Sequence, residues 1–342
     1  MCVSPYIVKC KDGSLVPVPC GHCFDCLEKY KDDWCFRLRQ ECKQVICPIH
    51  LTLTFADEYL PVRYNDEAGE FQSFVSKRDV QLFLKRLRKN FPEFRNNLRY
   101  FAIGEYGGKY NRAHYHIIII SSAIKWLHQY DNAFRVCWPD GFIKVTLADN
   151  KRIGYVTGYL HKLDDSSHIT NPFRLMSKHL GLCFLTEKMI DYFFTTFSCG
   201  VKDHHGYWKR LPRYYRKKLD EYSADDYRLR RAGLTFSDVI RFEKYAPKGI
   251  ERHFDYFVNN YDEIFRDVYR EESHRARVNG YSMPDFTHDD INRVFVIWSS
   301  SVKDIVDARL TSSLMIENIK VKQINTRLSK LAQQRAIRGP VV

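Results

Sequence analysis

The stretch His114-Tyr-His-Ile-Ile-Ile-Ile120 is the clearest strand signal in this chain of 342 residues. Its aromatic and β-branched side chains are typical of a strand buried in a sheet. The segment Arg99–Tyr106 also favours a strand, and Gly107–Ala113 between the two has the glycines and polar residues of a turn. We therefore expect an antiparallel hairpin at the centre of the fold.

Other segments extend this hairpin into a larger sheet with helices. The elements expected around it are strands over His50–Phe55 and Gly141–Leu147, a polar loop over Asp57–Ser73, and helices from Ser76 to Pro92, over Trp126–Val136 and over Asn150–Leu163. Beyond about residue 165 the pattern is mainly helical, although Ile291–Trp298 favours a strand. The sequence thus predicts an α+β fold, in which helices cover a central antiparallel sheet.

Composition limits the class of protein. Lys and Arg number 54 against 41 Asp and Glu, so the formal net charge is +13 and polyanionic partners are favoured. A hydrophobic content of 44% excludes a wholly disordered chain. The longest aliphatic run, Ile117–Ile120, is far shorter than the roughly 20 residues of a membrane helix, and the sequence starts without an apolar signal core. We expect a soluble protein of a reducing cytoplasm, with no membrane partner.

The pattern His114-Tyr-His116 predicts a metal site. Side chains alternate along a strand, so both imidazoles project to one face and offer two nitrogen ligands. Glu105 is the candidate third ligand for Mg²⁺ or Mn²⁺, and it joins the histidines only if the strand register places it opposite one of them. The sequence leaves that register open. The alternative is a pair of histidines that bind no metal.

Two tyrosines and a lysine fall on one stripe of the helix expected over Asn150–Leu163. Tyr155, Tyr159 and Lys162 stand at i, i+4 and i+7. A phenol has a pKa of about 10 and is a weak nucleophile. A metal ion that polarises the phosphodiester makes its phosphorus easier to attack, and a nearby lysine favours the phenolate form of the tyrosine. The alternative is that both tyrosines only pack at an interface.

The cysteines gather at the amino terminus. Cys20, Cys23 and Cys26 have the spacing of a tight metal-binding turn, and Cys2 or Cys10 could supply a fourth thiol. A structural zinc site is the hypothesis, and a reduced cluster without metal is the alternative.

A basic stretch over Lys202–Lys218 is interleaved with aromatic residues and predicts a surface for single-stranded nucleic acid, since basic groups pair with phosphates and rings stack on bases. The candidates are Lys209, Arg210, Arg213, Lys217, Lys218, Trp208, Tyr214 and Tyr215. The alternative is a solvated face beside buried aromatics. The tail bearing Val321, Ile324, Leu328 and Leu331 is a weaker candidate, or a helix that packs in the core or between subunits.

Taken in order, these motifs resemble the HUH superfamily of single-strand endonucleases. Matching segments are His50-Leu-Thr-Leu-Thr-Phe55, His114-Tyr-His116, and the helix with Tyr155, Tyr159 and Lys162. More closely, the chain resembles replication initiation proteins of gokushoviruses, a branch of the microviruses. That likeness covers about residues 1–220 and rests on Pro19-Cys-Gly-His-Cys-Phe-Asp-Cys26, Trp34-Cys-Phe-Arg37, Tyr100-Phe-Ala-Ile-Gly-Glu-Tyr-Gly107, Phe173-Arg-Leu-Met-Ser-Lys178 and Leu211-Pro-Arg-Tyr-Tyr215.

The resemblance implies a rolling-circle initiator that nicks a single-stranded origin, expected to form a hairpin, and stays linked through a 5′-phosphotyrosine. It also implies host helicase and polymerase as partners. We then expect a Cys-rich zinc-knuckle-like segment over 1–47, an HUH endonuclease domain over 48–220 and a mainly helical region over 221–342. Relatives often have Lys where Gly158 stands. The sequence therefore leaves open which of the two tyrosines attacks first. The alternatives are a non-catalytic zinc-containing nucleic-acid-binding protein and a relaxase- or transposase-like enzyme with one tyrosine.

Overall fold

The computed structural model describes residues 2–9, 15–108, 110–163, 168–241, 254–283, 285, 293–308 and 311. The chain divides into two compact units, Met1–Phe184 and Leu185–Val342, and each is described by itself. Compactness does not define where functional domains begin and end, so the boundaries expected at residues 47 and 220 stay predictions.

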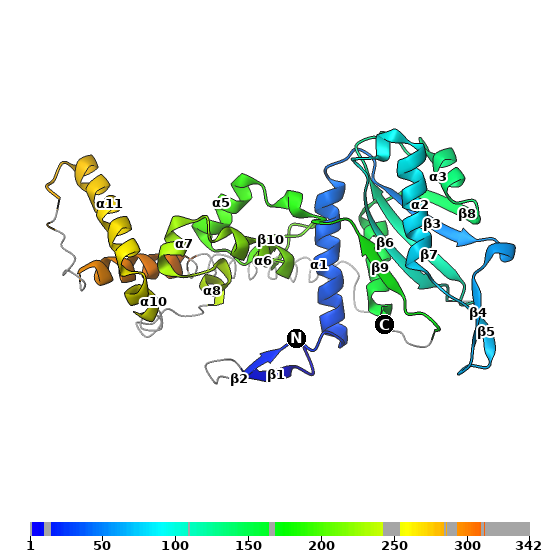
Figure 1. Cartoon of the computed structure of the whole chain (residues 1–342), viewed down its shortest axis with the longest axis horizontal. Helices are drawn as coiled ribbons and strands as arrows, with labels where there is room; N and C mark the ends of the chain where they lie inside the picture. The colour runs from blue at the N-terminus through cyan, green and yellow to red at the C-terminus, as the bar shows by residue number, and fades with distance from the viewer. Residues whose placement is uncertain are drawn as a thin grey trace, which may run out of the picture. The chain divides into compact units, whose positions relative to one another are not determined.

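A five-stranded antiparallel sheet forms the centre of the first unit, in the order β8-β3-β7-β6-β9 (Figure 1). The strands are β3 (Ile49–Phe55), β6 (Arg99–Tyr106), β7 (Ala113–Ile120), β8 (Gly141–Leu147) and β9 (Phe173–Met176). The four strands that the sequence predicts in this unit are therefore confirmed, and the hairpin β6–β7 lies inside the sheet. The α+β class is confirmed as well.

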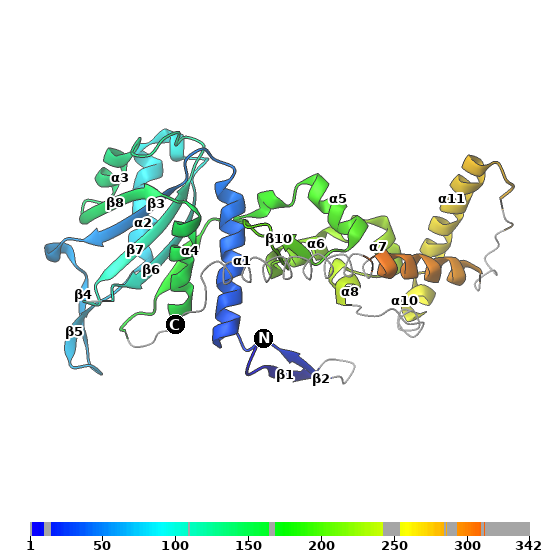
Figure 2. The same cartoon turned by 180° about the vertical axis from the view of Figure 1, so that it is seen from behind.

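Helices cover both faces of this sheet because its apolar residues alternate between them. On one face Leu51, Tyr115 and Ile117 pack in a core with α2 (Lys77–Asn90) and α3 (Asp131–Cys137). On the other face the core includes Phe101, Ile103 and Ile118 together with Trp34 and Ile153. These last two belong to α1 (Phe24–Cys42) and α4 (Asn150–Gly158), which lie side by side in Figure 2.

The ends of α2 and α4 follow local signals. The Ser76 hydroxyl accepts a hydrogen bond from the backbone N–H of Arg78 and caps α2, which ends before Pro92 as predicted. The Asp149 carboxylate caps α4 by accepting from the backbone N–H of Arg152. Beyond Gly158 the helix tightens into a 3-10 turn, η3 (Tyr159–Lys162). The turn still places Leu160 in the core, as the predicted helix would.

Two expectations near the sheet need correction. The segment Asp57–Ser73 is not a loop throughout, because it contains η1 (Asp57–Tyr59) and a hairpin of β4 (Val62–Asn65) and β5 (Glu70–Ser73). The Asn65 side chain closes its turn by accepting from backbone N–H groups, and the hairpin is mostly exposed, which explains its polar sequence. The helix expected over Trp126–Val136 begins only at Asp131, after His128 with a φ of 69°.

The amino-terminal segment and the second unit complete the described chain. A small hairpin of β1 (Tyr6–Lys9) and β2 (Leu15–Val18) precedes α1, and the short 3-10 turns are η2 (Pro92–Phe94) and η4 (Leu182–Phe184). The second unit contains α5 (Glu187–Thr196), β10 (Gly200–Lys202), β11 (Trp208–Arg210), α6 (Arg213–Tyr222), α7 (Tyr227–Ala232), α8 (Phe236–Arg241), α10 (Phe254–Asn259) and α11 (Tyr261–Asn279). It is mainly helical, as the sequence predicts.

The strand expected over Ile291–Trp298 is wrong where the structure describes it. Residues 293–308 are helical, and the buried side chains Val294, Trp298 and Val302 recur every four residues, which is the spacing of a helix face. The tail with Val321, Ile324, Leu328 and Leu331 lies outside the described residues. Among the helices that the structure describes, none has the length and apolar character needed to cross a bilayer.

Candidate functional site

The polar side chains of the sheet gather at one end of the face covered by α1 and α4. Glu105 and Thr54 both pair with His114, from the two strands that flank β7. Directly paired residues share a face, so Glu105 lies on the histidine face and the open question of register is answered. Two residues further along these strands, the same face carries His116, Thr52 and Lys144, from β7, β3 and β8.

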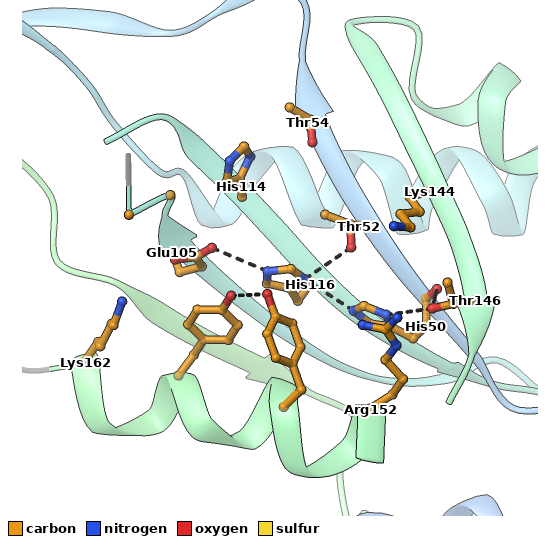
Figure 3. A pocket seen from close by; sticks show the side chains of 14 residues that line it. His50, Thr52, Thr54, Glu105, His114, His116, Lys144, Thr146, Arg152 and Lys162 are labelled. Atoms are coloured by element: carbon orange, nitrogen blue, oxygen red, sulfur yellow. Dashed lines mark hydrogen bonds and ion pairs between the residues drawn. The ribbon is translucent and has the colours of Figure 1, made fainter. Parts of the chain in front are cut away.

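His116 is at the centre of a chain of hydrogen-bonded side chains that crosses the sheet, here named the His116 row and shown in Figure 3. Its Nε2 lies 3.4 Å from Oε1 of Glu105, and its Nδ1 lies 3.3 Å from Nε2 of His50 and 3.3 Å from the Thr52 hydroxyl. The Nδ1 of His50 lies in turn 3.0 Å from the Thr146 hydroxyl. Four strands thus place one continuous chain of polar groups across the sheet.

His50 is the residue that sequence reasoning missed, although it stands at the start of the quoted strand motif. Alternation gave a signal, because His50 and Thr52 are two residues apart and must share a face. The register then pairs His50 with Ile118, two residues beyond His116 on β7. The structure therefore gathers three imidazoles on one face, where the sequence motif shows two.

These groups are buried, and burial sets their charge. Glu105 is 3% exposed and His116 is 4% exposed. Burial, assisted by the charges of His116 and Arg152, lowers the pKa of His50 to about 3. Burial also lowers the pKa of His114, against the opposing effect of Glu105. His50 and His114 are therefore neutral near pH 7, which is the form of imidazole that binds metals.

Both tyrosines lie against this row. The ring of Tyr159 stacks on His116 at 4.8 Å between centroids, and the ring of Tyr155 meets His116 edge-on at 5.5 Å. The two hydroxyls are hydrogen-bonded to each other. Tyr155 is 47% exposed, whereas burial and the hydrogen bond to Tyr155 raise the pKa of Tyr159. The phenols thus stand beside the imidazoles, but in unequal environments.

A pocket of about 410 Å³ opens where these side chains meet. Its lining includes every residue that the sequence predicted for the catalytic metal and for catalysis, with Lys162 among them. The Nζ of Lys162 lies 5.7 Å from the centre of the Tyr159 ring. The other lining residues are His50, Thr52, Thr54, Gly107, Gly108, Lys144, Thr146 and Arg152.

His114, His116 and Glu105 offer the donor types that divalent cations take in proteins, and a catalytic metal held by them stays a prediction. Two imidazoles and one carboxylate share a buried face, and the buried Nδ1 of His114 has no hydrogen-bond partner among the described residues. Gly107 makes room for this ring, since a Cβ there would lie 2.7 Å from Nε2 of His114. The three donor atoms do not all converge: in the described part of the chain, the amino-terminal thiols are the only group of three or more such residues whose donor atoms all lie within 4.8 Å of one another.

Those thiols form a second candidate metal centre. Cys2, Cys20, Cys23 and Cys26 each offer a sulfur within 4.8 Å of the others, so the cluster could hold a metal such as zinc. Cys2 supplies the fourth thiol, and the other candidate, Cys10, lies outside the described residues. The sulfur of Cys2 lies 3.6 Å from that of Cys20 and 3.8 Å from that of Cys23, close to the separation of about 3.8 Å expected around tetrahedral zinc.

The electrostatics of the cluster favour thiolate at two of its cysteines. Hydrogen bonds from the backbone of Val3 and Cys26 lower the pKa of the Cys23 thiol to about 6. A backbone hydrogen bond from Cys20 also lowers the pKa of Cys2. Against a backbone hydrogen bond from Gly21, desolvation and the neighbouring thiols raise the pKa of Cys26 to about 12. Thiolate is the form of cysteine that binds metal, so Cys2 and Cys23 are the thiols best prepared for ligation.

The predicted nucleic-acid surface lies on β11 and α6 in the second unit. Lys209, Arg210, Arg213 and Lys217 are exposed, and Trp208, Tyr214 and Lys218 are partly exposed. Lys209 pairs with Asp203 at 3.8 Å, and Lys218 pairs with Glu221. Tyr215 needs correction, because it is fully buried and packs in the core, where it cannot stack on a base.

Comparison with known proteins bears on this site. A profile of the replication-associated protein ORF2 family matches residues 48–164, which include the whole pocket. The chain is 25% identical to replication-associated protein ORF4 of Chlamydia phage 1 over 61% of its length, and 29% identical to replication-associated protein VP4 of Bdellovibrio phage phiMH2K over 58%. The chain resembles the microvirus-type replication-associated proteins. The likeness recognised from sequence is confirmed.

The replication-associated protein ORF2 of Spiroplasma virus 4 is similar as well, with 25% identity over 62% of this chain. The chain spans 55% and 65% of the Chlamydia and Bdellovibrio phage proteins. No solved structure matches. The HUH type of the sheet therefore stays a prediction from the sequence motifs.

Proposed function

We propose that this relative of the phage replication-associated proteins nicks and rejoins single-stranded DNA at a viral origin, and so starts rolling-circle replication. The observation behind the proposal is the contact between two tyrosines and the His116 row. Two hydrogen-bonded phenols lie against a buried imidazole that touches a carboxylate, inside a pocket open to solvent. The similarity to phage replication-associated proteins supports this interpretation.

The reaction is a transesterification. A tyrosine oxygen forms a bond to phosphorus, and the bond between phosphorus and the 3′ oxygen breaks. The phenol gives its proton to water in the open pocket, and the departing 3′ oxygen takes up a proton from water, so no net proton is gained or lost. The products are a 5′-phosphotyrosine and a free 3′ hydroxyl, which primes synthesis by the host machinery. Attack by a 3′ hydroxyl on the phosphotyrosine reverses the step and rejoins the strand.

The protein groups around the phenols have separate roles. His114, His116 and Glu105 would hold Mg²⁺ or Mn²⁺, which would polarise the scissile phosphate as a Lewis acid. Lys162 stands beside Tyr159 and favours negative charge on phenolate and phosphate. His50 keeps His116 oriented: an Nδ1–H of His116 can donate to Nε2 of His50, while Nδ1 of His50 donates to Thr146.

The test is a search for the covalent intermediate. Single-stranded oligonucleotides that tile the genome encoding the chain, including its hairpins, are labelled at the 3′ end and incubated with Mn²⁺. A labelled protein band that survives denaturation supports the proposal, because the 5′-phosphotyrosine joins the protein to the labelled fragment. Cleavage without such a band would indicate hydrolysis. Binding without cleavage or a band on any substrate would favour a non-catalytic nucleic-acid-binding protein.

The orienting role of His50 gives a prediction of its own. We expect His50→Ala to weaken Mn²⁺ binding about 10- to 100-fold, because loss of an outer partner leaves His116 free to rotate. His50→Gln keeps a hydrogen-bonding group and should recover part of the affinity. The measurement is Mn²⁺ titration by electron paramagnetic resonance, with circular dichroism to verify folding. Wild-type Mn²⁺ affinity in a folded His50→Ala protein would contradict the role.

The cysteine cluster is proposed to hold a structural zinc ion. We expect one zinc per chain by plasma mass spectrometry, and its loss in Cys20→Ser or Cys23→Ser, because three thiols no longer complete the tetrahedral shell. Cys183→Ser is the matched control, since Cys183 is also partly exposed but lies outside the cluster. Removal of zinc should lower the melting temperature. A wild-type protein free of metal would refute the site.

A further inference from the structure

We propose that Lys144 and Arg152 form a binding site for the DNA backbone next to the scissile phosphate. Lys144 is on β8 and Arg152 is in the first turn of α4, so two separate elements place them at one pocket. Figure 3 shows them on the side of His116 opposite to Lys162. The proposal deepens the proposed function, since it takes the ligand of this pocket to be a single DNA strand.

Sheet register fixes the position of Lys144. It pairs with Thr52, which pairs with His116 across β3, so all three side chains share the face of the site. Arg152 approaches the pocket from α4, a helix that covers this face of the sheet. Figure 3 shows both side chains beside His50, and all three residues line the pocket.

Two other arginines near the sheet are already paired. Arg112 bonds to the Asp57 carboxylate and the carbonyl of Phe55, and Arg99 pairs with Glu41. Within the described residues, the side chains of Lys144 and Arg152 make no hydrogen bond or ion pair. Two like charges next to a buried imidazole repel one another, and an anion in the pocket would relieve that repulsion.

The charge balance of the pocket indicates the sign of its ligand. Lys144, Arg152 and Lys162 face a single lining carboxylate, Glu105. A DNA strand passing the tyrosines can therefore meet a cation on either side of the reacting phosphate. Arginine offers a planar fork of donors to phosphate oxygens, while lysine acts as a point charge. The pair would hold one flanking phosphate and so fix the strand for attack.

The test measures binding without chemistry. Affinity for a fluorescein-labelled dT hexanucleotide is followed by anisotropy in EDTA over a series of salt concentrations. We expect Lys144→Gln and Arg152→Gln each to raise Kd about 3- to 10-fold. We also expect each to reduce the slope of log Kd against log salt by about 0.7, the value for one lost phosphate contact on a single strand.

Lys151→Gln is the matched control. Lys151 is exposed and adjacent to Arg152 in α4, but it does not line the pocket, so its Kd and slope should stay near wild type. Circular dichroism confirms folding, and the cap of α4 uses only the backbone of residue 152. Unchanged Kd and slope in a variant that combines Lys144→Gln with Arg152→Gln, or an equal effect of Lys151→Gln, would overturn the proposal. Because no nicking occurs in EDTA, this result is independent of the adduct assay.

Discussion

The double variant Tyr155→Phe/Tyr159→Phe is expected to lose the covalent protein–DNA adduct completely, with a fall in nicking rate of at least about 10³-fold. Phenylalanine keeps both rings against His116 but removes the two hydroxyls that bond to each other. The measurement is the labelled adduct assay with Mn²⁺. Tyr192→Phe is the control, since Tyr192 is an exposed tyrosine in the other unit. An adduct in the double variant would exclude both residues as nucleophiles.

The single variants separate a two-tyrosine enzyme from a one-tyrosine enzyme. Tyr155 is the more accessible phenol, and the raised pKa of Tyr159 disfavours its phenolate. We therefore expect Tyr155→Phe to block the first cleavage, and Tyr159→Phe to allow that cleavage but slow the joining that completes a cycle. If Tyr159→Phe completes the cycle at the wild-type rate, the enzyme uses a single tyrosine, as relaxase-like relatives would.

The second large effect is expected at His116. His116→Ala should reduce nicking at least about 10²-fold, while affinity for single-stranded DNA in EDTA stays within about twofold of wild type. The imidazole contacts Glu105, His50 and both tyrosine rings, so its loss removes the proposed ligand and its orienting contacts together. We expect the phosphates to be bound instead by the cations of the pocket and of the second unit.

His114→Ala should behave in the same way, because residue 114 lies opposite Glu105 in the sheet register and the buried Nδ1 of its imidazole has no hydrogen-bond partner among the described residues. The control is His128→Ala, at an exposed histidine beside α3. Nicking rates and anisotropy are measured on the same preparations, and thermal melting verifies the fold. A folded His116→Ala protein with strongly reduced DNA affinity would mean that the histidine binds DNA directly.

Local sequence patterns predicted much of the first unit. The strands at Arg99–Tyr106 and Gly141–Leu147 begin and end where the sequence places them, because alternation and turn residues act over a few neighbours. The helical stripe with Tyr155 and Tyr159 was predicted on the same basis. The short motif His114-Tyr-His116 also predicted that the two imidazoles lie on one face of the sheet. The mostly exposed hairpin Val62–Ser73 was not predicted, since polar strands outside the core have no hydrophobic pattern.

Contacts between distant segments were decided only by the tertiary structure. The sequence by itself determined that His114 and His116 share a face, but the register of β6 against β7 decided that Glu105 joins them. Folding also brought His50 to His116 and Cys2 to the other thiols, and it buried Tyr215. Periodicity reports which way a side chain points within its own element. Which partner it meets depends on how elements far apart in the chain pack together, and no local pattern contains that information.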